Sequence, residues 1–152
     1  CRCQAGHLAA QARVRYSYAF CGGAFMQGTV IFSIGMGAAL GAWLRYALGM
    51  AFNPTHPHLP LGTLSSNLIG AYLIGIALAY FANHPGISQE MRLFVITGFL
   101  GGLTTFSTFS AESVNLLMRA QYGWALATIS AHLYGSLALT IAGFWTVKLL
   151  RP

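Results

Sequence analysis

Four long apolar segments, separated by short breaks, constrain this chain more than any other feature. The hydrocarbon core of a bilayer is about 30 Å thick, and a helix needs about 20 apolar residues to cross it. Prolines and glycines interrupt the apolar pattern near residues 54–60 and 85–86, where a helix cannot continue. The sequence therefore predicts an all-α membrane protein with four transmembrane helices, at about residues 28–50, 62–82, 92–118 and 124–147.

The small number of charged side chains supports a membrane location. Only 7% of the residues are charged, whereas a soluble domain has about a quarter. An ordinary soluble enzyme and a disordered chain are excluded on this ground. The net charge of +6 comes from scattered basic residues, and a nucleic-acid site needs such residues clustered on one face. We expect no nucleic-acid partner.

The first 25 residues differ from the rest. They begin with cysteine, carry three arginines and show no helical periodicity. Met26 directly precedes the first apolar segment. We interpret residues 1–25 as an N-terminal extension upstream of the true start, and residues 26–152 as a four-helix transmembrane domain.

Orientation and small-residue patterns bear on assembly. From Met26 onward, three basic residues are predicted on one side of the membrane and two on the other. Membrane proteins are oriented by an excess of Lys and Arg on one side, and here that excess is small. Small residues recur at helical spacing in the first two segments, where they allow close helix packing. Each stripe fits packing within the chain as well as packing between copies. Together with the weak bias, the stripes favour a dimer, with the two subunits inserted in opposite orientations.

The third segment contains the most unusual stretch, residues 98–110. Gly101 and Gly102 are followed by five hydroxyl residues in seven positions. One interpretation is a helix whose hydroxyl groups bond back to the preceding turn. The other is a broken helix, which exposes carbonyl oxygens that can coordinate cations in transporters. The adjacent glycines favour the broken helix.

Two phenylalanines in this stretch, Phe106 and Phe109, share one helical face. An aromatic ring has a positive edge, so it can contact an anion without a full charge. Simple packing of the two rings is the alternative. The nearby hydroxyl groups of Thr105, Ser107 and Thr108 weaken the packing interpretation.

Other polar groups lie within the predicted spans. Asn67 either bonds across helices or offers its two N–H donors to a ligand. His132, Ser136 and Thr140 form a polar stripe on the fourth segment. An ionisable group inside a span, as at Glu112, is a functional candidate. Arg45 either extends to the membrane interface or attracts anions into a vestibule.

These residues carry a resemblance to a known family. The stretches 41–46, 62–70 and 98–112 closely resemble the Fluc/CrcB family of fluoride ion channels. The Gly-Gly-Leu-Thr-Thr-Phe-Ser-Thr-Phe string at 101–109 is highly specific. The similarity extends from about Met26 to Pro152.

The resemblance implies a fluoride-selective channel that passively exports toxic fluoride, not an enzyme, in the bacterial inner membrane. It implies an antiparallel, dual-topology homodimer with two fluoride pores and a structural Na⁺ at its centre, bound by the backbone carbonyls of Gly101 and Thr104. By motif position, the pore residues are Asn67, Phe106, Phe109, Ser107, Thr108, Ser136 and Thr140. Glu112 matches a glutamate near the polar track and Arg45 a vestibule arginine, whereas the family varies at His132.

Two other functions were weighed. A small four-helix dual-topology multidrug exporter needs an acidic residue in the first segment to exchange protons for cationic drugs, and residues 28–50 contain none. An intramembrane hydrolase that uses a serine and His132 needs a nucleophile motif, and no Gly-x-Ser-x-Gly pattern occurs near Ser107 or Ser110. The fluoride channel is therefore the leading hypothesis and the exporter is the alternative.

Overall fold

The computed structural model describes residues 28–56 and 58–150. The predicted extension at residues 1–25 and the proposed start at Met26 lie outside the described residues. Within them, four helical segments are long and apolar enough to cross a membrane: Gly28–Thr55, Leu61–Asn83, Gln89–Met118 and Tyr122–Leu149. The prediction of an all-helical chain with four such segments is confirmed.

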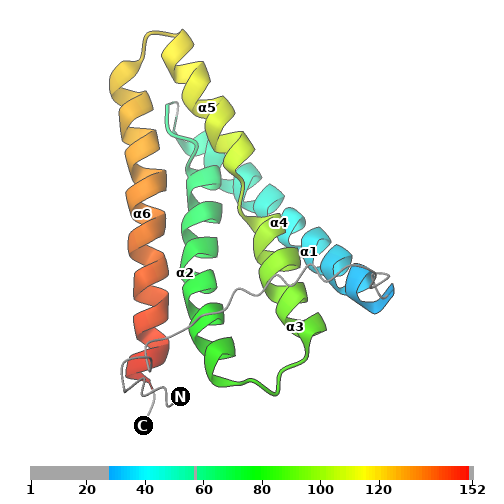
Figure 1. The fold of residues 1–152 in the computed structure, drawn as a ribbon. Coiled ribbons are helices and arrows are strands. Elements are labelled where there is room, and N and C mark those ends of the chain that lie inside the picture. The colour runs from blue at the N-terminus through cyan, green and yellow to red at the C-terminus, as the bar shows by residue number, and fades with distance from the viewer. Residues whose placement is uncertain (1–27, 57, 151–152) are drawn as a thin grey trace, which may run out of the picture.

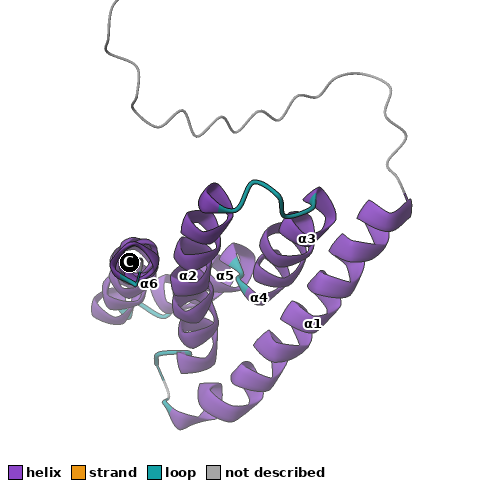
Figure 2. Ribbon diagram, turned by 90° about the horizontal axis from the view of Figure 1, so that it is seen from below, coloured by secondary structure: helices purple, strands orange, loops and turns teal. Residues whose placement is uncertain are grey.

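The four segments form a splayed bundle (Figure 1). Helix α1 (Gly28–Phe52) leads through a short 3₁₀ turn, η1 (Asn53–Thr55), into α2 (Leu61–Asn83). Helix α6 (Tyr122–Leu149) packs along α2, and these two helices run in the same direction. Figure 2 shows α6 and α1 at opposite sides of the molecule, with α2 and the third segment between them.

The third segment is built from several pieces. Helix α3 (Gln89–Leu93) is followed by a π-helical stretch, η2 (Phe94–Leu100), and by one helical turn, α4 (Gly101–Leu103). Helix α5 (Phe106–Met118) then continues to the end of the segment. Between α4 and α5, Thr104 and Thr105 have extended backbone, with φ/ψ of −82°/153° and −148°/118°. The side chain of Thr105 caps α5 by accepting a hydrogen bond from the Thr108 N–H.

Close contacts between backbones hold α1 against the third segment. A Cβ atom added at Gly41 would lie 2.7 Å from the Leu103 nitrogen, and one added at Gly102 would lie 2.5 Å from the Ala38 carbonyl oxygen. Gly37 faces Gly98 in the same way. The small-residue stripe of α1 is therefore used within the chain, because only glycine lets these backbones approach so closely.

The second helix uses its small residues in the same manner. Ser66 is fully buried. A Cβ atom at Gly62 would come within 2.6 Å of the Gly49 Cα, and one at Gly70 would collide with the Thr104 side chain. These stripes are occupied by contacts within one chain, so they do not support the predicted dimer.

Large apolar side chains are mostly on the outside of the bundle. Leu103 is the largest fully buried side chain among the described residues, whereas residues such as Phe32, Leu126 and Leu137 are exposed on α1 and α6. In a soluble protein such a surface would aggregate, but a lipid-facing surface is expected to be apolar. The exposure pattern therefore agrees with the four membrane-spanning segments.

Candidate functional site

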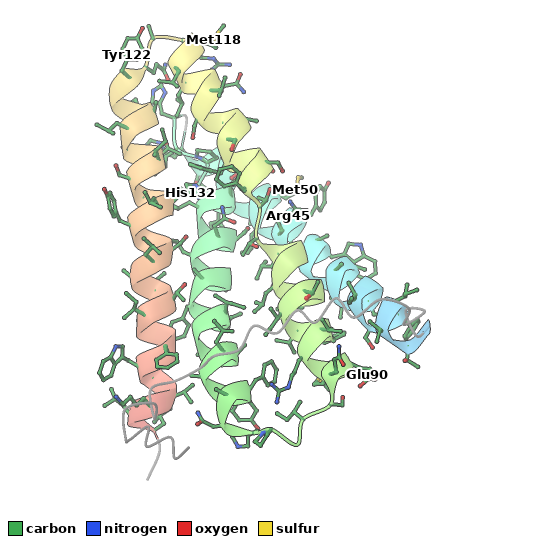
Figure 3. The ribbon with its side chains drawn as sticks, viewed as in Figure 1. Arg45, Met50, Glu90, Met118, Tyr122 and His132 are labelled. Carbon is green, nitrogen blue, oxygen red and sulfur yellow. The ribbon has the colours of Figure 1, made fainter. Side chains whose placement is uncertain are left out.

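An open groove of about 650 Å³ runs between α2, the third segment and α6. Seven of the predicted site residues line it, and they come from all three segments: Asn67, Gly101, Thr104, Phe106, Phe109, Ser136 and Thr140. His132 lines it as well, and its ring lies on the inner side of α6 (Figure 3). Within the part of the chain that the structure describes, no Asp, Glu, Lys or Arg lines the groove. The groove thus combines apolar walls with hydroxyl, amide and imidazole groups.

The amide of Asn67 is the anchor of this site. The Thr105 N–H donates to Asn67 Oδ1 at 2.7 Å, and Asn67 Nδ2 donates to the Thr105 carbonyl at 3.0 Å. These two bonds join α2 to the extended backbone between α4 and α5. They also fix the orientation of the amide, because the oxygen must face the N–H donor.

A third bond joins Asn67 to α6. Asn67 Nδ2 lies 3.0 Å from His132 Nδ1. Since Nδ2 can only donate, Nδ1 of His132 is the acceptor and its proton is on Nε2. His132 Nε2 is buried and has no hydrogen-bond partner among the described residues. Both N–H groups of Asn67 are therefore engaged within the chain.

The extended residues change the bonding of two carbonyl groups. In an unbroken α-helix, the Gly101 carbonyl would accept from the Thr105 N–H and the Thr104 carbonyl from the Thr108 N–H. Here the Thr105 N–H donates to Asn67 Oδ1 and the Thr108 N–H donates to Thr105 Oγ1. Both donors are diverted from their helical positions, so the Gly101 and Thr104 carbonyl oxygens become available to other ligands.

The two phenylalanines pack against each other, and Phe109 also packs against α6. The rings of Phe106 and Phe109 are 5.5 Å apart in an edge-to-face arrangement, and the Phe109 ring lies 4.6 Å from that of His132. Phe106 is 78% exposed on the single chain. Its side chain therefore contributes little to the interior and is free to contact a ligand or another chain.

The hydroxyl groups of α6 lie along the same groove. Ser136 and Thr140 follow His132 at intervals of one helical turn and line the groove with it. Thr140 Oγ1 donates to the Ala71 carbonyl at 3.0 Å, so its hydroxyl proton is engaged within the chain.

The remaining predicted residues do not line this groove. Arg45 and Thr108 line a second hollow of about 600 Å³, together with Asn53, Thr63 and Thr105. Arg45 on α1 lies across α5 from His132 in the view of Figure 3. Ser107 is exposed, and its Oγ lies 3.2 Å from Thr105 Oγ1. Thr105 lines both hollows and is the residue that joins them.

Glu112 is bound by a residue of α2 that does not line the groove. Thr63 Oγ1 donates to Glu112 Oε1 at 2.6 Å, while Glu112 Oε2 is buried and no described residue forms a hydrogen bond with it. The sequence interpretation missed Thr63 as a partner of Glu112. The sequence does contain a signal for Thr63: it lies four residues before Asn67, so both polar side chains share one face of α2.

Comparisons with known proteins identify a matching family and similar sequences. A family model described as "CrcB-like protein, Camphor Resistance (CrcB)" matches residues 32–144. A protein of Nitrosospira multiformis is 62% identical over 118 residues, which cover 78% of this chain and 92% of that protein. A protein of Thiobacillus denitrificans is 54% identical over 123 residues, or 81% of this chain and 99% of that protein. Both relatives carry the name fluoride-specific ion channel FluC.

The family match covers well over half of the chain and includes every predicted site residue. Together with the four helices that can cross a membrane, it indicates a multi-pass membrane protein. The resemblance seen in the sequence motifs is confirmed, and the chain belongs to the CrcB-like family of proteins.

Proposed function

We propose that this protein is a fluoride-selective channel that lets fluoride cross the membrane passively. One observation carries the proposal: the groove between α2, α5 and α6 brings Asn67, Phe106, Phe109, Ser136 and Thr140 together without any fully charged side chain. The names of the relatives add support, since they are called fluoride-specific ion channels.

The chemistry of the groove suits a small, hard anion. An isolated ion in a low-dielectric medium faces a cost of tens of kcal/mol unless other groups replace its water. A channel site must also release the ion, so full positive charges would bind it too firmly. Hydroxyl O–H donors and the positive edges of aromatic rings provide weaker stabilisation, distributed along the path. Thr140 donates to an anion when its O–H exchanges the Ala71 carbonyl for that anion. Ser107 and Thr108 extend the same chemistry beyond the groove.

Asn67 takes part in a particular way. Its two N–H groups are engaged with the Thr105 carbonyl and His132 Nδ1. An anion beside Asn67 receives a hydrogen bond when one of these N–H groups exchanges its partner. The bond to His132 is the one that can be exchanged without releasing the backbone of Thr105, so we assign fluoride to that side of the amide.

The diverted N–H donors of Thr105 and Thr108 support a structural sodium site. The Gly101 and Thr104 carbonyl oxygens are hard ligands of the kind that unwound transporter helices use for Na⁺. Two carbonyls are too few for a cation in one chain, whereas two copies in an antiparallel, dual-topology homodimer supply four. The bound cation contributes positive charge and rigidity at the centre of the dimer. Phe106, exposed on the single chain, then faces a pore between the copies.

Two charged residues complete the path. Arg45, in the second hollow, attracts anions toward the site, and Glu112, bound by Thr63, lies beside the polar path. The protein resides in the bacterial inner membrane, where it exports fluoride from the cytoplasm down its gradient. The multidrug exporter is not favoured, because α1 contains no acidic residue and the relatives are named as channels.

The test is an efflux measurement. The purified protein is reconstituted into liposomes loaded with potassium fluoride or potassium chloride, and a potassium ionophore starts efflux. Passive fluoride efflux, with chloride retained, is the expected result. The proposal fails if fluoride stays inside, or if chloride leaves equally fast. The cation site is tested by comparing the oligomeric state of the protein in sodium-containing and sodium-free buffer. We expect the dimer to be lost in sodium-free buffer.

A further inference from the structure

A groove of about 680 Å³, here called the side groove, lies between the second half of α2 and the beginning of the third segment. Leu73, Ala77 and Phe81 line it from α2, and Val95 and Phe99 line it from η2. Lipid chains are as apolar as these side chains, and helices associate in membranes by close packing. The occupant of such a groove in a membrane is therefore a lipid chain or another helix.

The side groove extends through one half of the membrane. Leu73 lies near the middle of α2 and Phe81 near its end. The helix rises by about 12 Å between these two residues, and one leaflet of the hydrocarbon core is about 15 Å thick. The polar lining residues Tyr80 and Ser88 lie at the end of the bundle where α2 is joined to α3 (Figure 1). Tyrosine is typical of the membrane interface, so the groove runs from the interface to the midplane.

A basic residue lies at the interfacial end of the side groove. Arg92 Nη2 donates to the His84 carbonyl at 3.0 Å, and Arg92 Nε donates to the Ile87 carbonyl at 3.3 Å. The guanidinium also lies over the Phe81 ring, 5.6 Å from its centroid. Phe81 and Ile87 both line the groove. These partners carry no full charge, and Glu90, two residues earlier, lies on another face of α3. The positive charge of Arg92 is therefore available to an anion.

We propose that the side groove binds an acyl chain of an anionic phospholipid, whose phosphate group lies beside Arg92. The chain of a lipid in one leaflet matches the groove in length and polarity, and its headgroup is at the level of the connection between α2 and α3. A basic residue near the membrane surface favours anionic lipids. A zwitterionic lipid is bound less well, because its ammonium group offsets the charge of its phosphate.

A second copy of the chain is the alternative occupant. In the antiparallel homodimer proposed above, the copy would bring its α5–α6 connection to this side of the membrane. That connection contains Arg119 and no acidic residue. One cation would then face another at the mouth of the groove, whereas a lipid phosphate pairs with Arg92. This comparison rests on the proposed dimer, and it favours the lipid.

Charge variants of Arg92 test the recognition of the headgroup. The purified protein in detergent is mixed with phosphatidylglycerol or phosphatidylcholine, both carrying palmitoyl and oleoyl chains. Native mass spectrometry then measures the lipid retained and the oligomeric state. Arg92→Lys and Arg92→Gln both remove the guanidinium contacts to the connection between α2 and α3, but only lysine keeps the charge. Arg119→Gln, at the opposite end of the bundle, is the control.

The ratio of retained phosphatidylglycerol to phosphatidylcholine is the decisive quantity. We expect Arg92→Gln to lower this ratio about fivefold, which is the preference that one basic residue gives an anionic lipid. Arg92→Lys and Arg119→Gln are expected to keep the ratio of the unmodified protein. An unchanged ratio in Arg92→Gln, or an equal loss in both Arg92 variants, would overturn the proposal.

A substitution within the groove tests the acyl chain. Val95→Trp fills the groove and leaves Arg92 in place, and Val114→Trp makes the same change on the exposed surface of α5. Retention of phosphatidylglycerol is expected to fall severalfold in Val95→Trp alone, with the oligomeric state unchanged. Unchanged retention would overturn the proposal, and loss of the dimer with the lipid still retained would assign the groove to a second copy. Lipid retention is measured without transport, so a failure of fluoride efflux refutes the proposed function separately.

Discussion

Replacement of Asn67 by aspartate is the sharpest test of the site. The substitution keeps the size and shape of the side chain but replaces the Nδ2 donor by a carboxylate oxygen. That oxygen would face the Thr105 carbonyl, an acceptor, at 3.0 Å. It would also face His132 Nδ1 at 3.0 Å, which becomes a donor when the ring moves its proton from the unpartnered Nε2. The bond from the Thr105 N–H to Oδ1, at 2.7 Å, would remain.

Two separate penalties follow from this geometry. The loss of the hydrogen bond to the Thr105 carbonyl, with that acceptor left buried, costs about 1–3 kcal/mol. A negative charge about 4 Å from a permeating anion raises its energy by about 4 kcal/mol at an effective dielectric constant of about 20. The second penalty acts on transport alone and corresponds to about a thousandfold lower efflux rate.

The assay is fluoride efflux from liposomes, combined with thermal unfolding in detergent followed by size-exclusion chromatography. Asn83→Asp is the matched control, because Asn83 lies on the same helix near its exposed end and bonds only to the preceding turn. We expect a near-complete loss of efflux for Asn67→Asp and little change for Asn83→Asp. A folded Asn67→Asp protein with an unchanged rate would refute both the role of Asn67 and the path through the groove.

Three further substitutions have defined outcomes. Gly37→Ala places a Cβ 2.8 Å from the Phe99 nitrogen and is expected to lower stability by about 1–3 kcal/mol, whereas Gly35→Ala, with open space around it, lowers the unfolding temperature little or not at all. Phe106→Ile removes a ring edge and is expected to slow fluoride efflux at least severalfold with the fold intact. The same change at the exposed Phe144 is the control. Equal efflux rates for the two variants would favour simple ring packing. Ala120 has a φ of 57° at the end of α5, so Ala120→Gly is expected to stabilise the protein by about 1 kcal/mol, and a lower unfolding temperature would contradict that reasoning.

The four helices could be predicted from the sequence because each carries its own signal. Apolar length, prolines and glycines are local properties, so the predicted spans agree with the helices to within a few residues. Apart from the 3₁₀ turn that extends the first segment to Thr55, the largest difference is at the start of the third segment, which begins at Gln89 rather than at residue 92. There the Ser88 side chain caps the helix by accepting from the Met91 N–H, and polar residues such as Glu90 are tolerated in a first turn.

The contacts between segments could not be predicted in the same way. The bonds between Asn67 and Thr105 join residues 38 positions apart, and the bond from Thr63 to Glu112 spans 49. Such pairs depend on how the helices are packed, which no local pattern encodes. The small-residue stripes show the same limit, since their spacing predicted close packing but not whether the partner was the same chain or a second copy. The structure places these contacts within the chain.

The bonds between Asn67 and the extended backbone have a consequence for biosynthesis. Unpaired peptide groups are not tolerated in the lipid interior. Asn67 precedes Thr105 in the chain, so the ribosome delivers the amide to the membrane before the residues that need it. The third segment can therefore leave the insertion machinery with the N–H and carbonyl groups of Thr105 already paired, and the last helix is needed only to complete the assembly around His132.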